Sequence, residues 1–243
     1  MSSLNRRTLL TMSAAVTLPA LAQVPQGCGE QPNTAPALQP PLLLTDWAWL
    51  ARYRDDNAKL LASSAKVHVV FLGDSITEAW AKTDAEFFSN GIVGRGISAQ
   101  TTPQLLVRMY SDVIALKPRV VHIMAGTNDI AHNTGPMTAE DTHNNFMAMC
   151  EIAKANKIHV VLGSVPLASK YWWRPEAKPK AEAIALNEWL RGYAYRSGFK
   201  FADYATALTD AQGNAKLELA KDEVHPTPEG YAVMRPIALT AIR

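Results

Sequence analysis

The chain has 243 residues, 48% of them hydrophobic and 19% charged, which is enough apolar material for a core without metal or disulfide support. It carries 24 basic and 22 acidic residues; residues 1–22 hold two of the arginines and no acidic residue, so the remainder has 22 of each sign. This balance, together with the lack of an arginine-rich run, argues against a nucleic-acid-binding protein.

Residues 1–22 are organised like a signal peptide for export. A pair of arginines at positions 6 and 7 precedes the mildly apolar stretch Thr8–Leu18, and Ala20-Leu21-Ala22 offers small residues for cleavage. The paired arginines favour a twin-arginine signal, with an ordinary Sec signal as the alternative. We therefore expect an exported protein, periplasmic or secreted, that begins near Gln23 after cleavage. No later apolar run reaches about 18 residues, so no membrane span is predicted.

Residues 23–44 form a Pro-rich segment that we interpret as a linker before one domain over residues 45–243. This linker contains Cys28, and the second cysteine, Cys150, lies in a helical pattern that favours a buried thiol. A disulfide between the two cysteines is an alternative. A lipid-modified Cys28 is another, although Pro25 stands where a lipobox has an aliphatic residue.

Helical and strand-like patterns alternate through the rest of the chain. We expect helices over 46–62, 102–116, 138–156, 181–196 and from 228 onward, and strands over 67–72, 91–93, 120–124, 159–163 and 199–201. Thr102, Thr138 and Thr227 mark three of the helix starts as capping residues. The alternation predicts an α/β fold with a mainly parallel sheet and helices on both faces.

Ser75 follows the apolar strand directly, in Phe71-Leu72-Gly73-Asp74-Ser75-Ile76-Thr77. The carboxyl end of a buried parallel strand is where open α/β sheets build their sites. A serine there is a candidate nucleophile, which needs a neighbouring base. The alternative for Ser75 is an ordinary helix N-cap.

An imidazole and a carboxylate stand together far downstream, in Asp222-Glu223-Val224-His225-Pro226. His225 is the candidate base, and Asp222 would orient its ring and fix the tautomer. Glu223 is a lesser candidate for the acid, and a polar surface loop is the alternative for the whole segment. Asn128 follows another apolar run and could donate to an oxyanion, with a simple turn as its alternative.

These segments together resemble the SGNH hydrolases, also called the GDSL esterase/lipase family, in four ordered blocks. The blocks are Gly73-Asp74-Ser75-Ile76, residues 94–102, Gly126-Thr127-Asn128-Asp129 and Asp222-Glu223-Val224-His225-Pro226. The blocks look most like the branch of bacterial sugar esterases and platelet-activating-factor acetylhydrolase-like enzymes. The resemblance implies a flavodoxin-like three-layer α/β/α sandwich of about five strands. It also favours Asp222 over Glu223 as the acid of the triad.

The resemblance further implies an oxyanion hole made by Ser75 N–H, the Asn128 side chain and one backbone N–H of the second block. Where the family usually has a second glycine in that block, alignment on Ile97-Ser98 and Thr101 places Ala99. An alanine still supplies its N–H. If that is its only role, we expect Ala99 to have φ below zero, because positive φ is costly for alanine.

A loop rich in aromatic residues follows the expected strand 159–163. Tyr171, Trp172, Trp173 and Arg174 should emerge at the edge of the sheet where Ser75 lies, so they are candidates for substrate contact. The alternative is a packed loop whose rings cover the sheet edge.

Taken together, these features predict an exported serine ester hydrolase that acts on short-chain esters, with O-acetyl groups of carbohydrates as a candidate substrate. Its partner would be a small-molecule or saccharide ester, without cofactor. The histidines lack the spacing of metal ligands, so no metal is predicted. The alternative function is a carbohydrate- or lipid-binding module on the same fold with an impaired site. A flavodoxin-like binding protein is a third hypothesis, although no phosphate-cradling loop follows the first strand.

Overall fold

The computed structural model describes residues 45–243. The predicted signal peptide (1–22), the linker (23–44) and Cys28 lie outside the described residues. Cys150 is buried with a free thiol, as expected, and burial raises the pKa of that thiol to about 12. Among residues 45–243, no helix combines the length and apolar character needed to cross a lipid bilayer.

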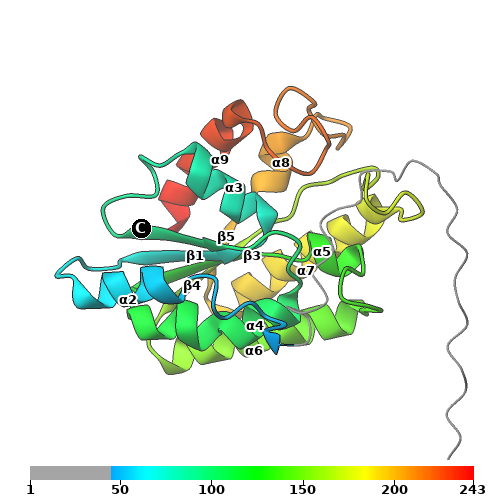
Figure 1. The fold of residues 1–243 in the computed structure, drawn as a ribbon. Coiled ribbons are helices and arrows are strands. Elements are labelled where there is room, and N and C mark those ends of the chain that lie inside the picture. The colour runs from blue at the N-terminus through cyan, green and yellow to red at the C-terminus, as the bar shows by residue number, and fades with distance from the viewer. Residues whose placement is uncertain (1–44) are drawn as a thin grey trace, which may run out of the picture. The chain divides into compact units, whose positions relative to one another are not determined.

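Five parallel strands form one sheet in the order β2-β1-β3-β4-β5 (Figure 1). Their bounds are Val69–Gly73 (β1), Ile92–Gly96 (β2), Val120–Met124 (β3), His159–Gly163 (β4) and Lys200–Ala202 (β5). Every residue of β1 and β3 is buried, which explains why these central strands read as unbroken apolar runs. The strand order reverses between β1 and β3, and the crevice at the carboxyl ends of such a pair is the usual ligand site of an open α/β sheet.

Helices cover both faces of the sheet, which confirms the predicted three-layer sandwich (Figure 1). One layer contains α2 (Arg54–Ala62), α4 (Thr102–Asp112), α6 (Ala139–Ala155) and α7 (Pro179–Ser197). The other contains α3 (Ser75–Thr83), α8 (Tyr204–Leu208) and α9 (Pro228–Ala241). The buried side chains of the first layer are mainly aliphatic. The second layer is richer in buried aromatic rings, with Trp80 stacked on Tyr231 at a centroid distance of 5.5 Å.

Several element boundaries differ from the sequence predictions. The first described helix begins at Arg54 instead of Asp46, because the Asp46 carboxylate accepts the N–H groups of Leu50 and Ala51 and holds that stretch as turns. The helix expected over 102–116 divides into α4 and a 3₁₀ turn, η1 (Ile114–Leu116). Its cap is Thr101, one residue before the predicted Thr102, and Gln104 completes a capping box with it.

The second strand extends to Gly96, three residues beyond its predicted end. The prediction stopped early because glycine has a low propensity for strands. A Cβ on Gly96 would lie 2.2 Å from Glu78 N and 2.6 Å from Asp74 O. The missing side chain therefore lets the end of β2 pack directly against the start of α3. This contact brings the second motif block beside Ser75.

Candidate active site

Ser75 is the first residue of α3, at the carboxyl end of β1. Asp74 is the N-cap of this helix, and its Oδ1 accepts the N–H of Ile76 at 3.0 Å. A Cβ on Gly73 would lie 2.7 Å from Met124 O and 2.1 Å from the Thr77 hydroxyl, so glycine is required for this sharp strand-to-helix turn. The turn presents the Ser75 hydroxyl and backbone N–H at the positive end of the helix dipole.

His225 lies against Ser75 from the other end of the chain. The Ser75 Oγ and His225 Nε2 atoms are 2.9 Å apart, and His225 Nδ1 lies 2.7 Å from Asp222 Oδ2. The second carboxylate oxygen of Asp222 accepts the backbone N–H groups of Val224 and His225, at 3.0 and 2.7 Å. One short turn therefore holds the imidazole and the carboxylate in a fixed relation. The three side chains are a hydroxyl, a base and an orienting acid in hydrogen-bonded order.

Glu223, the lesser candidate for the acid, points elsewhere. Its carboxylate accepts the backbone N–H of Ser169 at 2.5 Å and so links the His225 segment to the loop after β4. The backbone of Glu223 has φ of 66°, and this residue turns the chain between Asp222 and His225. The structure thus pairs the imidazole with Asp222.

The charges around His225 favour its protonated form. Burial lowers the pKa of His225, but the hydrogen bond and the charge of Asp222, with the charge of Asp74 added, raise it above 6.5 on balance. Burial raises the pKa of Asp222, yet hydrogen bonds from the His225 ring and from backbone N–H groups bring it down to about 2. Asp222 is therefore ionised throughout the range in which His225 titrates.

Asn128 lies in α5 (Thr127–Ile130), directly after β3. Gly126 precedes this helix with φ of 118°, a conformation that only glycine adopts readily. The Asn128 side-chain nitrogen donates to Gln100 O at 2.9 Å and makes a longer contact of 3.4 Å with Asp74 Oδ2. The amide is thereby anchored on one side by the loop that contains Ala99, and its second N–H points toward the Asp74-Ser75 turn.

Ala99 has φ of 65°, so the expectation of a negative φ at this position is wrong. The loop turns through a left-handed residue between Ser98, whose N–H and hydroxyl bind Glu78 Oε2, and the buried Gln100. A glycine would fit this conformation without strain, whereas alanine adopts it at a cost of about 1–2 kcal/mol. In the described part of the chain, the Ala99 N–H donates to no protein acceptor, so it is free to bind a ligand.

Two kinds of comparison place the chain among known proteins. The model of the GDSL-like lipase/acylhydrolase family matches residues 71–233, a span that holds Ser75, Asn128, Asp222 and His225. The chain belongs to this family. It is therefore an enzyme, an acylhydrolase that acts on small-molecule esters, as the sequence predicted. No match was found among curated protein sequences.

Solved structures of related acylhydrolases agree with this assignment. A GDSL-like lipase from Bacteroides thetaiotaomicron is 41% identical, with a TM-score of 0.77 over 81% of this chain and 98% of its own. A protein from Bacteroides fragilis is 43% identical, with a TM-score of 0.77 over 81% and 97% of the two chains. An acetylxylan esterase from Geobacillus stearothermophilus, 21% identical, shares the fold with a TM-score of 0.61 over 74% of this chain and 94% of its own.

The aromatic loop of this acylhydrolase divides into buried and accessible parts. Tyr171 is only 1% exposed, which for this residue favours the alternative of a ring packed within the loop over contact with substrate. Trp173 stacks on Tyr171 at a centroid distance of 4.8 Å, and its ring lies 6.3 Å from that of His225. Trp172 is 48% exposed. Arg174 donates to the carbonyls of Ala131 and His132, so it fastens the loop beside α5 instead of standing free.

Two further residues join this site that the sequence did not single out. Asn133 donates to Asn128 Oδ1 at 2.8 Å and accepts from the Trp173 indole at 3.2 Å. The fully buried side chain of Gln100 accepts from Arg108 at 2.6 Å and donates to Ala48 O at 2.7 Å, which fixes the loop beside Ala99. Their polar character alone gave no signal, because Asn and Gln are common in loops and helix ends.

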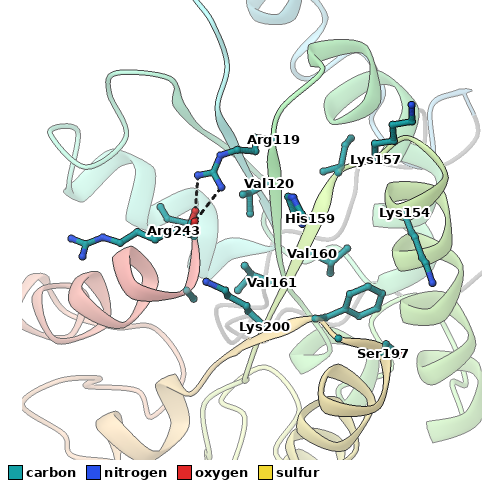
Figure 2. Close-up of a pocket in the computed structure, with 15 residues that line it drawn as sticks. Arg119, Val120, Lys154, Lys157, His159, Val160, Val161, Ser197, Lys200 and Arg243 are labelled. Carbon is teal, nitrogen blue, oxygen red and sulfur yellow. Dashed lines mark hydrogen bonds between the residues drawn. The ribbon is translucent and has the colours of Figure 1, made fainter.

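The acylhydrolase also has a pocket of about 570 Å³ at the opposite, amino-terminal edge of the sheet (Figure 2). Cationic side chains line it: Arg119, Lys154, Lys157, Lys200 and Arg243. The helices α6, α7 and α9 all end there, and their C-terminal carbonyls attract positive charge. Arg119, for example, donates to Ile242 O at 2.8 Å. Helix ends therefore account for these cations, and the pocket is separate from the Ser75 site.

Proposed function

We propose that this protein is an exported serine esterase in which Ser75, His225 and Asp222 form the catalytic triad. The observation that carries the proposal is the hydrogen-bonded series from Ser75 Oγ to His225 Nε2, 2.9 Å, and from His225 Nδ1 to Asp222 Oδ2, 2.7 Å. A serine hydroxyl is a weak nucleophile alone, and a base at this distance can take its proton as it attacks.

In the reaction, His225 Nε2 accepts the Ser75 proton while Ser75 Oγ bonds to the ester carbonyl carbon. The ionised Asp222 stabilises the imidazolium that forms. The carbonyl oxygen becomes an oxyanion, for which the donors are Ser75 N–H, Ala99 N–H and the Asn128 N–H that makes the longer, 3.4 Å contact with Asp74. His225 then protonates the leaving alkoxide, and water activated by the same imidazole releases the acid from Ser75.

For the substrate, we propose short-chain esters, with acetylated saccharides as the class to test first. The Trp173 ring lies 6.3 Å from the His225 ring and would limit the length of an acyl chain. The half-exposed Trp172 offers an apolar face that can stack on a sugar ring. The acetylxylan esterase that shares this fold acts on such an ester.

The alternative of a binding module with an impaired site rested on Ala99. Its N–H is unoccupied and its backbone already has the left-handed conformation that glycine would adopt, so the substitution does not remove the donor. Membership of an acylhydrolase family likewise favours an enzyme.

The decisive experiment measures hydrolysis of p-nitrophenyl acetate by the wild type and by Ser75→Ala. We expect turnover by the wild type and a loss of at least about 10³-fold in the variant, with an unchanged melting temperature. Equal turnover by the two proteins would disprove the assignment of Ser75. A panel of esters that differ in acyl length and in alcohol then tests the substrate class.

Export is a separate part of the proposal and rests on residues 1–22. We expect N-terminal sequencing of protein recovered outside the cytoplasm to begin at or near Gln23. Replacing Arg6 and Arg7 with lysines should block export if the signal is of the twin-arginine type and leave it intact if the signal is of the Sec type. A full-length chain that retains residues 1–22, or a lipid on Cys28, would contradict the proposed cleavage.

A further inference from the structure

We propose that Trp173 and Asn133 are positioning residues that orient the Asn128 amide toward the oxyanion, an inference that rests on the proposed function. The three side chains form a continuous series of hydrogen bonds. Trp173 Nε1 donates to Asn133 Oδ1 at 3.2 Å, Asn133 Nδ2 donates to Asn128 Oδ1 at 2.8 Å, and Asn128 Nδ2 donates to Gln100 O at 2.9 Å.

The direction of this series follows from its two ends. An indole nitrogen can only donate, so Asn133 must turn its oxygen toward Trp173 and its nitrogen toward Asn128. A backbone carbonyl can only accept, so Asn128 must turn its nitrogen toward Gln100 O. Both ends therefore require the same orientation of the Asn128 amide, with Oδ1 toward Asn133 and Nδ2 toward Gln100 O. In this orientation the second N–H of Nδ2 points toward the Asp74-Ser75 turn.

A rotated Asn128 amide would lose both contacts. Its oxygen would face Gln100 O, and its nitrogen would face the nitrogen of Asn133. The oxygen and the nitrogen of the buried Asn128 amide would then each lose the partner that they have now. Asn128 is only 4% exposed, so water could not easily compensate. The rotated amide would also aim an acceptor at the developing oxyanion, where a donor is needed.

Asn133 is itself held from several directions. Its backbone N–H donates to Asn128 O at 3.0 Å, and its side-chain nitrogen makes a long contact of 3.5 Å with Ala99 O. Arg174 binds the carbonyls of the two residues that precede Asn133, so the loop that carries Trp173 and the segment that carries Asn133 move together. The series thus connects the aromatic loop beside His225 to two of the three proposed oxyanion donors.

The first test is kinetic and uses Trp173→Phe and Asn133→Asp. Trp173→Phe keeps a ring on Tyr171 and removes the indole donor, while Asn133→Asp can still accept from Trp173 and can no longer donate to Asn128. Because Gln100 O still holds the amide, we expect kcat to fall about tenfold in Trp173→Phe and 10- to 10²-fold in Asn133→Asp. KM should change less than twofold, and in Asn133→Asp, which leaves the Trp173 ring in place, the loss should be equal for acetyl and butyryl esters. Trp189→Phe, an indole stacked on His143 outside the site, should keep wild-type kcat.

The second test asks whether the effect passes through Asn128. In an Asn128→Ala background, neither Trp173→Phe nor Asn133→Asp should lower kcat further, because the amide that they orient is gone. A merely structural role would instead give the same loss in both backgrounds and would overturn the proposal. Wild-type kcat in both single variants would also overturn the proposal. Turnover that survives Ser75→Ala would refute the proposed function itself, which keeps the two failures distinct.

A third measurement covers the case in which Asn133→Asp fails to fold. The Trp173 indole proton is identified in an ¹⁵N-labelled sample as the signal absent from Trp173→Phe. In Asn133→Ala this signal should move upfield, since its acceptor is lost. An unchanged indole signal would show that the first hydrogen bond of the series does not form in solution, and would overturn the proposal.

Discussion

Ser75 Oγ and His225 Nε2 lie 2.9 Å apart although 150 residues separate them in the chain. The strand-to-helix turn after β1 presents the hydroxyl, and the turn before α9 presents the imidazole. Two rigid supports therefore hold the pair, which makes its chemistry testable without disturbing the fold.

The pair should act as one unit. Ser75→Ala and His225→Ala should each reduce kcat by at least about 10³-fold, and the double variant should be little slower than either single one. The reason is that the base has no function without the hydroxyl that it deprotonates. Multiplied losses in the double variant would show that the two side chains act independently. Circular dichroism should confirm that all three proteins are folded.

The pH dependence of kcat/KM should report the pKa of His225. The base is active only when neutral. Burial lowers the pKa of His225, but the Asp222 hydrogen bond and the charges of Asp222 and Asp74 together raise it above 6.5. Activity should therefore be lost as pH falls through a midpoint above 6.5. In Asp222→Asn the charge of Asp222 disappears while burial and the smaller effect of Asp74 remain, so the midpoint should move to lower pH, with kcat lower by 10²- to 10⁴-fold. A midpoint that does not move would show that Asp222 does not affect the protonation of His225. Glu223→Gln is the control: it leaves the pair intact and should keep the wild-type midpoint.

The left-handed Ala99 should limit stability slightly. Ala99→Gly relieves a strain of about 1–2 kcal/mol and raises the entropy of the unfolded chain by somewhat less, so we expect a net gain of about 0.5 kcal/mol and a melting temperature higher by 1–2 °C. Activity should be unchanged, because the N–H remains. Ala99→Val should lower both the melting temperature and the activity, because a β-branched residue tolerates positive φ poorly. A glycine variant less stable than the wild type would contradict the strain at this position.

The buried ion pair beneath the Ala99 loop should matter more to stability. Arg108 and Asp112 are essentially without solvent exposure and lie 2.9 Å apart, and Arg108 also binds Gln100 and Arg95 O. Arg108→Ala leaves the Asp112 carboxylate buried without the cation that binds it, and we expect the free energy of unfolding to drop by about 3–5 kcal/mol in urea titrations. Lys59→Ala, which breaks an exposed contact with Asp56, is the control and should cost less than about 0.5 kcal/mol. Comparable losses in the two variants would be inconsistent with a dry ion pair.

The two tryptophans of the aromatic loop should have different effects on specificity. Trp173→Ala removes a wall 6.3 Å from His225 and should raise kcat/KM for octanoyl relative to acetyl esters by roughly tenfold. Trp172→Ala should instead raise KM for acetylated saccharides if its exposed ring stacks on sugar. Melting temperatures distinguish these effects from lost packing. An unchanged acyl profile in Trp173→Ala would show that this ring is no wall of the acyl site, and an unchanged KM for acetylated saccharides in Trp172→Ala would show that its ring does not stack on sugar.

Much of this architecture could be predicted from the chain. The apolar runs of β1, β3 and β4 are buried on both faces, so each reads as a strand without knowledge of its neighbours. Parallel strands joined by helices end at one edge, which is why the positions of Ser75 and Asn128 after such runs predicted that they would meet. Strand β2 was predicted too short because the reason for its two glycines, close packing against α3, is visible only in the tertiary structure.

The sequence by itself thus determined the layered sheet and the residue types at its catalytic edge, because both depend on local periodicity and on chain direction. Only the tertiary structure decided the positive φ of Ala99, the burial of Tyr171 and the series from Trp173 through Asn133 to Asn128. The Ala99 loop and the series depend in part on contacts between loops 30 or more residues apart, where amide orientation follows from the partner that each group finds. A polar residue in a loop is compatible with many partners, and packing selects one of them.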